Sequence, residues 1–491
     1  MSLHIIQSHT LSQLVQYFFA QFQQAQANDT LFDTQHIITP NPAVKQWILQ
    51  HIARQQGICA NIQWHTSIHE FKWTSFRDIK NTPDHKEKVR NANLPRLVIK
   101  WRVYHYLLSQ FTLYKNHAEQ FIDSPLSPIF QRILNQAQYS KNQQQAQGNH
   151  HDTLPLEQQQ MIYWFADQTA RVFGNYLTHR MQWLNQWSGD CVIAVEDELN
   201  KYAANNPFAD KEIEKAQEIE RWQRHLWHTL FKENFSKIIK VERAFWETLK
   251  EQGENHQLPK SLFIFTLLDL APSQLNFLKR LALHIDIYIF HFSPTQEYWA
   301  DSVDPRWKLQ HDLKIKQRIR KKYPKLTEQA FEQLMPAYQP ELNAEHYEAR
   351  HPLLTRFGKQ ARDHFSLLSE FSGGELGEWI DAFDDAAGNE PTFAPNLLGQ
   401  LQSDIFYLLN PEAGSHHLQD DDTSIQIHVC HSPLRQLEVL KERLLHWLND
   451  GDGRQPQDIL VLTPNLTQFE PYIRTVFSQS KLPFQLAGTT P

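Results

Sequence analysis

The sequence has few cysteines, no long apolar run and no surplus of positive charge. Its three cysteines, Cys59, Cys191 and Cys430, are widely separated, which argues against a disulfide framework and suits a reducing compartment. No stretch of about 18 apolar residues occurs, and the first residues lack the pattern of a secretion signal. We therefore expect a cytoplasmic protein that does not enter the membrane. With a net charge of −7, any contact with nucleic acid must be local.

A glycine-rich phosphate loop is also absent. Such a loop needs glycines, whose backbone amides approach phosphates, and a lysine followed by a hydroxyl residue. After the apolar segment that ends at Thr39, the chain reads Pro40-Asn41-Pro42 and offers no glycine before Lys45. The two prolines remove donor amides. We predict that the chain hydrolyses no ATP and carries no catalytic site of its own.

Two segments resemble parts of metal sites. Residues 191–195, followed by the acidic residues 196–198, have the pattern of an apolar strand that ends in magnesium-binding acids, but a solvated acidic turn explains them as well. His65 and His69 have a spacing that would place two imidazoles on one helix face, yet no further ligands accompany them. We therefore predict no metal site.

The length and the apolar content indicate several packed cores. A chain of 491 residues exceeds what one hydrophobic core serves, and about two to four folding units are expected. With 41% hydrophobic residues and 14 tryptophans, most of the chain should fold.

Short apolar runs alternate with amphipathic segments in two parts of the chain, which predicts parallel strands covered by helices. Strands are expected at residues 3–7, 36–39, 261–266 and 285–292, and helices at residues 11–26, 43–56 and 272–283. Helical spacing dominates from about residue 95 to 246 and predicts a helical insertion.

The strand and helix pattern restarts near residue 421. Strands are expected at residues 424–430 and 458–462, helices at 433–448 and 466–477, and a possible third strand at 483–486. These elements are too few for a complete domain of this kind, since such domains usually need about 100 residues or more. We expect the chain to be truncated at Pro491.

Positive charge gathers in two places. The strongest run could contact phosphates or form a solvated helix face, and it consists of Lys314, Lys316, Arg318, Arg320, Lys321, Lys322 and Lys325. Arg96, Lys100 and Arg102, beside Trp101, form a smaller patch with the same two interpretations.

The order of several blocks resembles the gamma-chain (RecC) family of bacterial exodeoxyribonuclease V. The strongest block is residues 424–433 with the helix that follows, and the others are residues 57–58 with 60–62, 352–354 with 358–359 and 362–363, and 396–398 with 402–405. Single blocks have low specificity, but their order and spacing extend over nearly all of the chain.

The resemblance implies an α/β fold, with a RecA-like, helicase-like parallel sheet and a large helical insertion, and then the incomplete start of a second RecA-like domain. The implied parts are residues 1–94 (first part of domain 1A), 95–250 (a 1B-like insertion), 251–420 (the rest of domain 1) and 421–491 (a 2A-like start).

The resemblance also implies a non-catalytic subunit that assembles with the beta (RecB) and alpha (RecD) chains as a heterotrimer. These partners would use ATP and Mg²⁺, while this chain would bind double- and single-stranded DNA and scan a channel for the Chi sequence. Gln46 and Arg180 match channel positions of the family that contact DNA. Pro40, Pro42, Arg171 and Gly174 depart from the mostly polar residues found there, so either a different sequence is read or the reading of Chi is weak.

Three other functions remain open. The chain could be a truncated, inactive fragment of that subunit. A free-standing DNA helicase would need the phosphate loop that is absent. A nuclease would need a cluster of acidic residues with a nearby lysine, and the sequence shows no convincing one.

Overall fold

A computed structural model describes residues 2–27, 33–141, 155–196, 210–253, 258–265, 270–300, 320, 327, 329–330, 351–369, 377–384, 388–412, 414–451, 453–478 and 482–486. By its internal packing the chain divides into two compact units. The first unit comprises Met1–Thr392 and Ser403–Pro411, and the second comprises Phe393–Gln402 and Glu412–Pro491.

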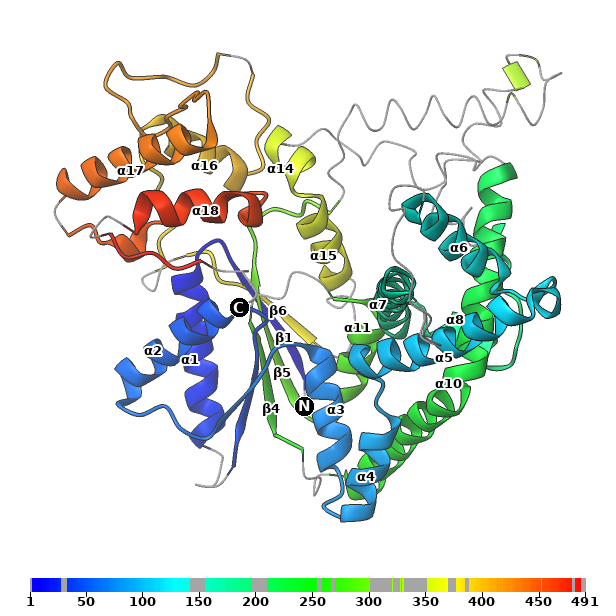
Figure 1. Cartoon of the computed structure of the whole chain (residues 1–491). Coiled ribbons are helices and arrows are strands. Elements are labelled where there is room, and N and C mark those ends of the chain that lie inside the picture. Colours follow the sequence, from blue (N-terminus) through cyan, green and yellow to red (C-terminus); the bar gives the residue numbers. More distant parts are fainter. Residues whose placement is uncertain are drawn as a thin grey trace. The chain divides into compact units, whose positions relative to one another are not determined.

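A six-stranded parallel sheet lies at the centre of the first unit, and Figure 1 labels four of its strands, β1, β4, β5 and β6. The sheet has the strand order β3-β2-β4-β5-β1-β6. Its strands are β1 (Leu3–Ser8), β2 (Gln35–Ile38), β3 (Ile62–His65), β4 (Ser261–Phe265), β5 (Asp286–Phe292) and β6 (Gly377–Asp381). The parallel sheet is therefore confirmed, and β1, β2, β4 and β5 lie within a residue or two of their predicted places. The strands β3 and β6, which were not predicted, form its two edges.

The central strand β4 shows why this sequence makes a covered sheet. Every residue of its SLFIF sequence is buried. Successive side chains of a strand point to opposite faces, so Phe263 and Phe265 enter one core, whereas Leu262 and Ile264 enter the other. A continuous apolar run is typical of a parallel strand with helices on both sides.

Helices α1 (Leu11–Ala27) and α2 (Pro42–Gln56) cover one face of the sheet (Figure 1). The buried side chains of α1 recur at helical spacing, which gives the helix one apolar stripe. Phe18 lies at the centre of this core, with ring centroids 5.5 Å from Phe263 and 5.6 Å from Phe290. Both predicted helices are confirmed.

The other face is covered by α3, α4, α11 and the C-terminal part of a long helix, α10. Their bounds are α3 (Ile68–Asp78), α4 (Pro83–Ala92), α10 (Asp210–Gln252) and α11 (Pro272–Leu281). Phe245 of α10 contacts Phe76 of α3, with ring centroids 4.8 Å apart. The half-buried ion pair between Lys72 Nζ and Glu242 Oε2, at 3.1 Å, also joins α3 to α10.

Helices follow one another between α4 and β4, which confirms the predicted helical stretch. They are α5 (Arg96–Asn116), the short 3-10 helix Ala118–Phe121, α6 (Ser127–Lys141), α7 (Leu156–His179), α8 (Met181–Ser188) and α10. Val103 and Phe111 of α5, Phe173 of α7, and Trp227 and Phe231 of α10 share their core. None of the described helices is long and apolar enough to cross a membrane.

The rest of the described first unit packs around Trp299. Helices α14 (Pro352–Phe357) and α15 (Lys359–Ser369) contribute Leu354 and Phe365 to this cluster, which also contains Leu408. Gly358, between the two helices, has no room for a side chain, because an added Cβ would lie 2.5 Å from the Leu354 carbonyl oxygen and 2.9 Å from the Trp299 ring.

The second unit contains the helices α17 (Pro433–Asn449) and α18 (Leu466–Phe477), and both confirm their predictions. The 3-10 helix Pro456–Asp458 precedes α18. Helix α16 (Leu397–Phe406) begins in the second unit and ends in the first. Ser432 and Asn465 cap α17 and α18 with side-chain oxygens that accept backbone N–H groups. A small core of Leu437, Val476 and Phe477 joins the two helices.

The prediction of strands in the second unit is wrong. Residues 424–430, 459–462 and 483–486 are not strands, and Asp458 ends the 3-10 helix instead. Val429 is 96% exposed and Leu462 is 84% exposed. Backbone amides and carbonyls form a strand only when a neighbouring strand pairs with them, and no such strand lies beside these segments in the described part of the second unit.

Candidate nucleic-acid interface

The loop between β2 and α2 has the position that a phosphate loop takes in nucleotide-binding folds, between a strand and a helix. Asn41 caps α2 by accepting a hydrogen bond from the Ala43 amide at 2.8 Å, and Pro42 occupies the first helical position without an N–H group. Helix N-termini bind anions through free amides. This loop therefore offers a phosphate fewer donors than a glycine-rich loop does.

Two histidines of the adjacent strands β2 and β3 form a pair, in which His65 is buried and His36 is half-buried. His36 Nδ1 and His65 Nε2 are 3.0 Å apart, and burial together with the neighbouring His65 lowers the pKa of His36 to about 4. Burial also lowers the pKa of His65. His65 ends β3, whereas His69 lies in the first turn of α3, so the expected placement of both on one helix is wrong. Among the described residues, no group of three or more His, Cys, Asp or Glu side chains could hold a metal ion.

A cleft of about 1050 Å³ opens between α3, α4, the N-terminus of α5 and the C-terminal part of α7. We call it the basic cleft. Its lining includes Trp73 and Arg77 of α3, Lys86 and Arg90 of α4, and Arg96 of α5. On α7 it is lined by Gly174, Leu177 and Thr178. The consecutive helices α3, α4 and α5 therefore meet α7, which is distant in the sequence, at one surface.

Two cations of the basic cleft are available to a ligand. Arg77 is paired with Asp78 at 2.7 Å and Arg96 with Asp167 at 2.8 Å. Lys86 and Arg90 lie one turn apart on α4, and neither forms an ion pair with a carboxylate in the described residues. Lys86 instead donates a hydrogen bond to the Asn81 side chain at 2.7 Å.

The acidic side chains of the basic cleft offset only part of this charge. They are Glu70 and Glu87, against the four cations Arg77, Lys86, Arg90 and Arg96. Glu70 is already held by Thr66, whose amide and hydroxyl donate hydrogen bonds to Oε2 at 2.8 and 2.7 Å. The formal charge of the lining side chains is thus positive, although Asp78 and Asp167, which lie outside the lining, pair with two of the four cations.

The walls of the basic cleft suit a nucleotide chain. Trp73 is half-buried and exposes part of an aromatic ring, while Lys86 and Arg90 present charge to phosphates. Gly174 leaves the α7 wall open, because a Cβ added there would meet no atom within 4 Å. Cations beside an aromatic surface are the combination that binds single strands.

The two predicted channel residues do not line the basic cleft. Arg180 joins α7 to α8, two residues beyond the cleft residue Thr178, and its guanidinium lies 5.4 Å from the centre of the Trp183 ring. Gln46 is exposed on α2, which packs on the face of the sheet opposite to α3. The structure therefore does not bring Gln46 and Arg180 to one surface, and their contacts with DNA remain predictions.

Most of the predicted basic run lies outside the described residues. These are Lys314, Lys316, Arg318, Lys321, Lys322 and Lys325, while Arg320 is described and exposed. In the smaller patch, Lys100 also contacts Asp167, at 3.3 Å. Arg102 instead donates a hydrogen bond to Asn234 of α10 at 2.6 Å. The phosphate-binding role of the long run remains a prediction.

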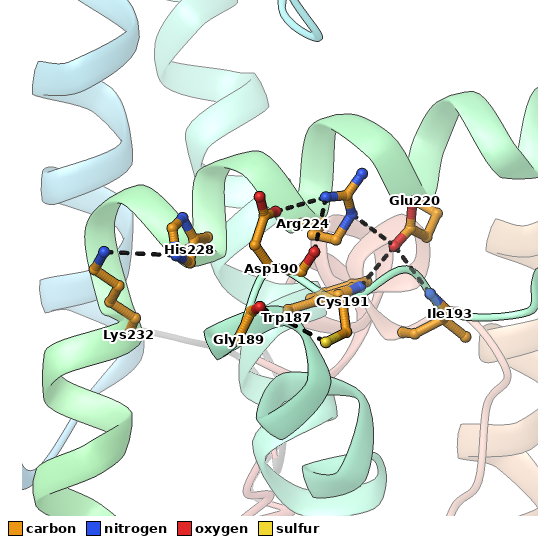
Figure 2. Close-up of polar contacts among 9 residues, drawn as sticks. All are labelled: Trp187, Gly189, Asp190, Cys191, Ile193, Glu220, Arg224, His228 and Lys232. Atoms are coloured by element: carbon orange, nitrogen blue, oxygen red, sulfur yellow. Dashed lines mark hydrogen bonds and ion pairs between the residues drawn. The ribbon is translucent and has the colours of Figure 1, made fainter.

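The strand considered at residues 191–195 is not formed. Figure 2 shows the turn after α8 held by Glu220 of α10, which is only 7% exposed. Its Oε1 accepts hydrogen bonds from the Trp187 indole at 2.9 Å, the Ile193 amide at 3.4 Å and Arg224 at 3.2 Å. Arg224 in turn donates to Asp190 at 2.5 Å. These bonds hold residues 190–193 against α10. Of the acidic residues, Glu196 is exposed, and Asp197 and Glu198 lie outside the described residues.

Comparison with known proteins identifies the family. Residues 3–408 match the family model described as "RecC, N-terminal domain". The chain belongs to this RecC family. It is 25% identical to the RecBCD enzyme subunit RecC of Haemophilus influenzae over 474 residues, which cover 93% of the chain and 38% of the relative.

Further relatives carry the same name. The Escherichia coli subunit is 25% identical over 486 residues, covering 92% of the chain and 36% of that subunit. The Mycobacterium tuberculosis subunit is 30% identical over 216 residues, which cover 44% of the chain and 16% of the relative. The chain thus spans less than two fifths of the length of these curated relatives.

Sequence patterns gave only weak signals for the basic cleft. Trp73, Lys86 and Arg90 lie in α3 and α4, two helices that were not predicted from the sequence. The signals that were present are the capping serine Ser67 with Glu70 three residues later, and Pro83 at the start of α4.

Proposed function

We propose that the chain is a DNA-binding scaffold subunit of a RecBCD-type helicase-nuclease complex, exodeoxyribonuclease V, which acts in double-strand break repair by homologous recombination. The observation that carries this proposal is the basic cleft. Its cations Lys86 and Arg90 lie beside Trp73 and are available to a ligand, although the whole chain has a net charge of −7. Its ligand would be single-stranded DNA, held by its phosphates and scanned for Chi.

The proposed partners follow from the family. The curated relatives are named as subunits of the RecBCD enzyme. This chain would accordingly assemble with RecB and RecD in the cytoplasm, and these partners would supply the ATP- and Mg²⁺-dependent motor and nuclease chemistry.

A RecA-like origin of the first unit is part of the proposal. A parallel sheet with helices on both faces and a helical insertion after α4 is the arrangement expected of such a domain. The boundaries at residues 94, 250 and 420, and a second helicase-like domain from residue 421, are proposed on the same basis.

A scaffold role is favoured over that of a free-standing helicase. The loop after β2 contains Asn41 and Pro42 where a motor would bind phosphates. The Ala43 amide already donates a hydrogen bond to the Asn41 side chain. Motor chemistry would then lie in other subunits, and this chain would contribute binding and orientation.

Binding of a fluorescent thymidine oligonucleotide to the purified chain tests the proposal. Reversing both free charges, with Lys86→Glu and Arg90→Glu, should weaken binding by about tenfold or more and flatten its dependence on salt concentration. The matched control is Lys115→Glu with Arg132→Glu, which changes net charge equally at exposed positions on α5 and α6. Equal effects of the two double variants, or no binding by the unchanged protein, would contradict the proposal.

A further inference from the structure

A group of exposed aromatic side chains lies on the outer surface of α5 and α7. Trp101 is 42% exposed and Tyr163 is 41% exposed, and their ring centroids are 5.9 Å apart. Tyr104 lies edge-on to both, at 5.5 Å from Trp101 and 6.1 Å from Tyr163, and is partly buried against the bundle core. We call these three residues the aromatic platform. Mutual support holds the rings in place although two of them face solvent.

A lysine charge accompanies the aromatic platform. Lys100 Nζ lies 3.9 Å from the centre of the Tyr163 ring and 5.9 Å from that of Trp101. The hydrogen bond that Lys100 donates to the Tyr163 hydroxyl raises the pKa of the ammonium group, so it stays charged at neutral pH. Arg96 and Lys100 share the single carboxylate of Asp167, which leaves a net positive charge beside the rings.

The aromatic platform continues from the basic cleft along the same two helices. On α5, Arg96 lines the cleft, and Lys100 and Tyr104 follow at intervals of four residues, which keeps them on one helix face. On α7, the cleft residue Gly174 shares a face with Asp167 and Tyr163. The ion pair between Arg96 and Asp167 marks the junction of the two surfaces.

We propose that the aromatic platform stacks the bases of a single strand of DNA whose neighbouring nucleotides occupy the basic cleft. This inference rests on the proposed function and extends its binding site along α5 and α7. Aromatic rings bind bases of any sequence by stacking, while adjacent cations hold the phosphates. The bound DNA is thus a single strand too long to fit in the basic cleft alone.

Two observations favour DNA over a protein partner as the occupant. A cation lies within cation–π distance of each exposed ring, and the platform is continuous with a cleft whose lining carries positive formal charge. A protein-binding hot spot would also use Trp and Tyr, but it would not depend on the length of an oligonucleotide.

Oligonucleotides of two lengths test the inference. An oligothymidine of about 5 nucleotides should fill the basic cleft only, whereas one of about 20 should also reach the aromatic platform. Trp101→Leu with Tyr163→Leu removes the stacking rings but keeps an apolar surface. This double variant should weaken binding of the long strand by about tenfold or more and leave binding of the short strand unchanged.

Two further variants serve as controls. Trp101→Phe with Tyr163→Phe keeps the rings and should retain most of the affinity. Trp164→Leu removes the tryptophan next to Tyr163 on α7, which is 64% exposed but lines a different hollow with Met161 and Trp222. This last change should have no effect on strands of either length. Thermal unfolding checks that every variant is folded.

Photo-cross-linking gives a second readout. A long strand that carries 5-iodouracil should cross-link to peptides containing Trp101 or Tyr163, and the cross-links should disappear in the leucine double variant. Cross-links confined to the basic cleft, or leucine variants that bind the long strand normally, would overturn the inference. If Lys86→Glu with Arg90→Glu still weakens binding by about tenfold or more in that case, the proposed function stands. If the unchanged chain binds no strand, the proposed function itself fails.

Discussion

Two apolar stretches of similar composition have opposite fates in the two units. Ser261–Phe265 is a fully buried central strand of the first unit. Residues 459–462, Ile-Leu-Val-Leu, belong to the second unit and are not a strand, and Leu460 and Leu462 are largely exposed. The difference shows that β propensity needs partners. A strand forms where neighbouring backbones accept its hydrogen bonds and helices cover both faces.

Hydrogen exchange should show the largest contrast between the two units. Backbone amides of β4 pair with β2 and β5 and exchange only when the sheet opens, whereas residues 424–430 and 459–462 have no strand partner in the described part of the chain. We expect exchange of these second-unit amides to be faster by at least about a thousandfold. Equal protection, measured by mass spectrometry on peptides, would show that the second unit forms a sheet in solution.

Truncation of one apolar side chain in each unit sharpens the comparison. Phe263→Ala should destabilise the first unit by about 3–5 kcal/mol, because Phe263 is buried among Phe18, Phe22 and Tyr288. Leu462→Ala, at an exposed position, should change stability by about 0.5 kcal/mol or less. Urea unfolding followed by circular dichroism measures both. A large loss on Leu462→Ala would mean that this side chain has a packing partner in solution.

Acid should weaken the first unit through its buried histidines. The pKa of His36 is about 4 and that of His291 about 3, each lowered mainly by burial, whereas an unfolded histidine has a pKa of about 6.5. Below pH 6.5 these histidines bind protons in the unfolded chain but not in the folded chain. The free energy of unfolding therefore decreases as the pH is lowered. The loss should reach about 3 kcal/mol for His36 near pH 4.

A substitution isolates the His36 contribution. Urea titrations across this pH range should show a shallower loss of stability for His36→Gln than for the unchanged chain, because glutamine does not titrate. An unchanged slope would mean that the pKa of His36 is about the same in the folded and unfolded chains.

Sequence patterns predicted the sheet best where strands are buried on both faces. The strands β1, β4 and β5 are apolar runs that the sequence reveals directly. The edge strand β6, Gly-Glu-Trp-Ile-Asp, has no such run because it is partly exposed, and it was missed. The basic cleft was missed for another reason. It arises from the packing of α3, α4, α5 and α7, and no local pattern records which distant helices meet.

The length of α10 has a mechanical consequence. At 43 residues it extends for about 65 Å as a single helix. Its Trp227 and Phe231 belong to the core of the helical insertion, and its Phe245 and Leu249 belong to the core beneath the sheet. The helix is therefore a rigid connection between the two cores. A force applied to the helical insertion would tilt α10 as a whole, with little bending, and so would be transmitted to the sheet.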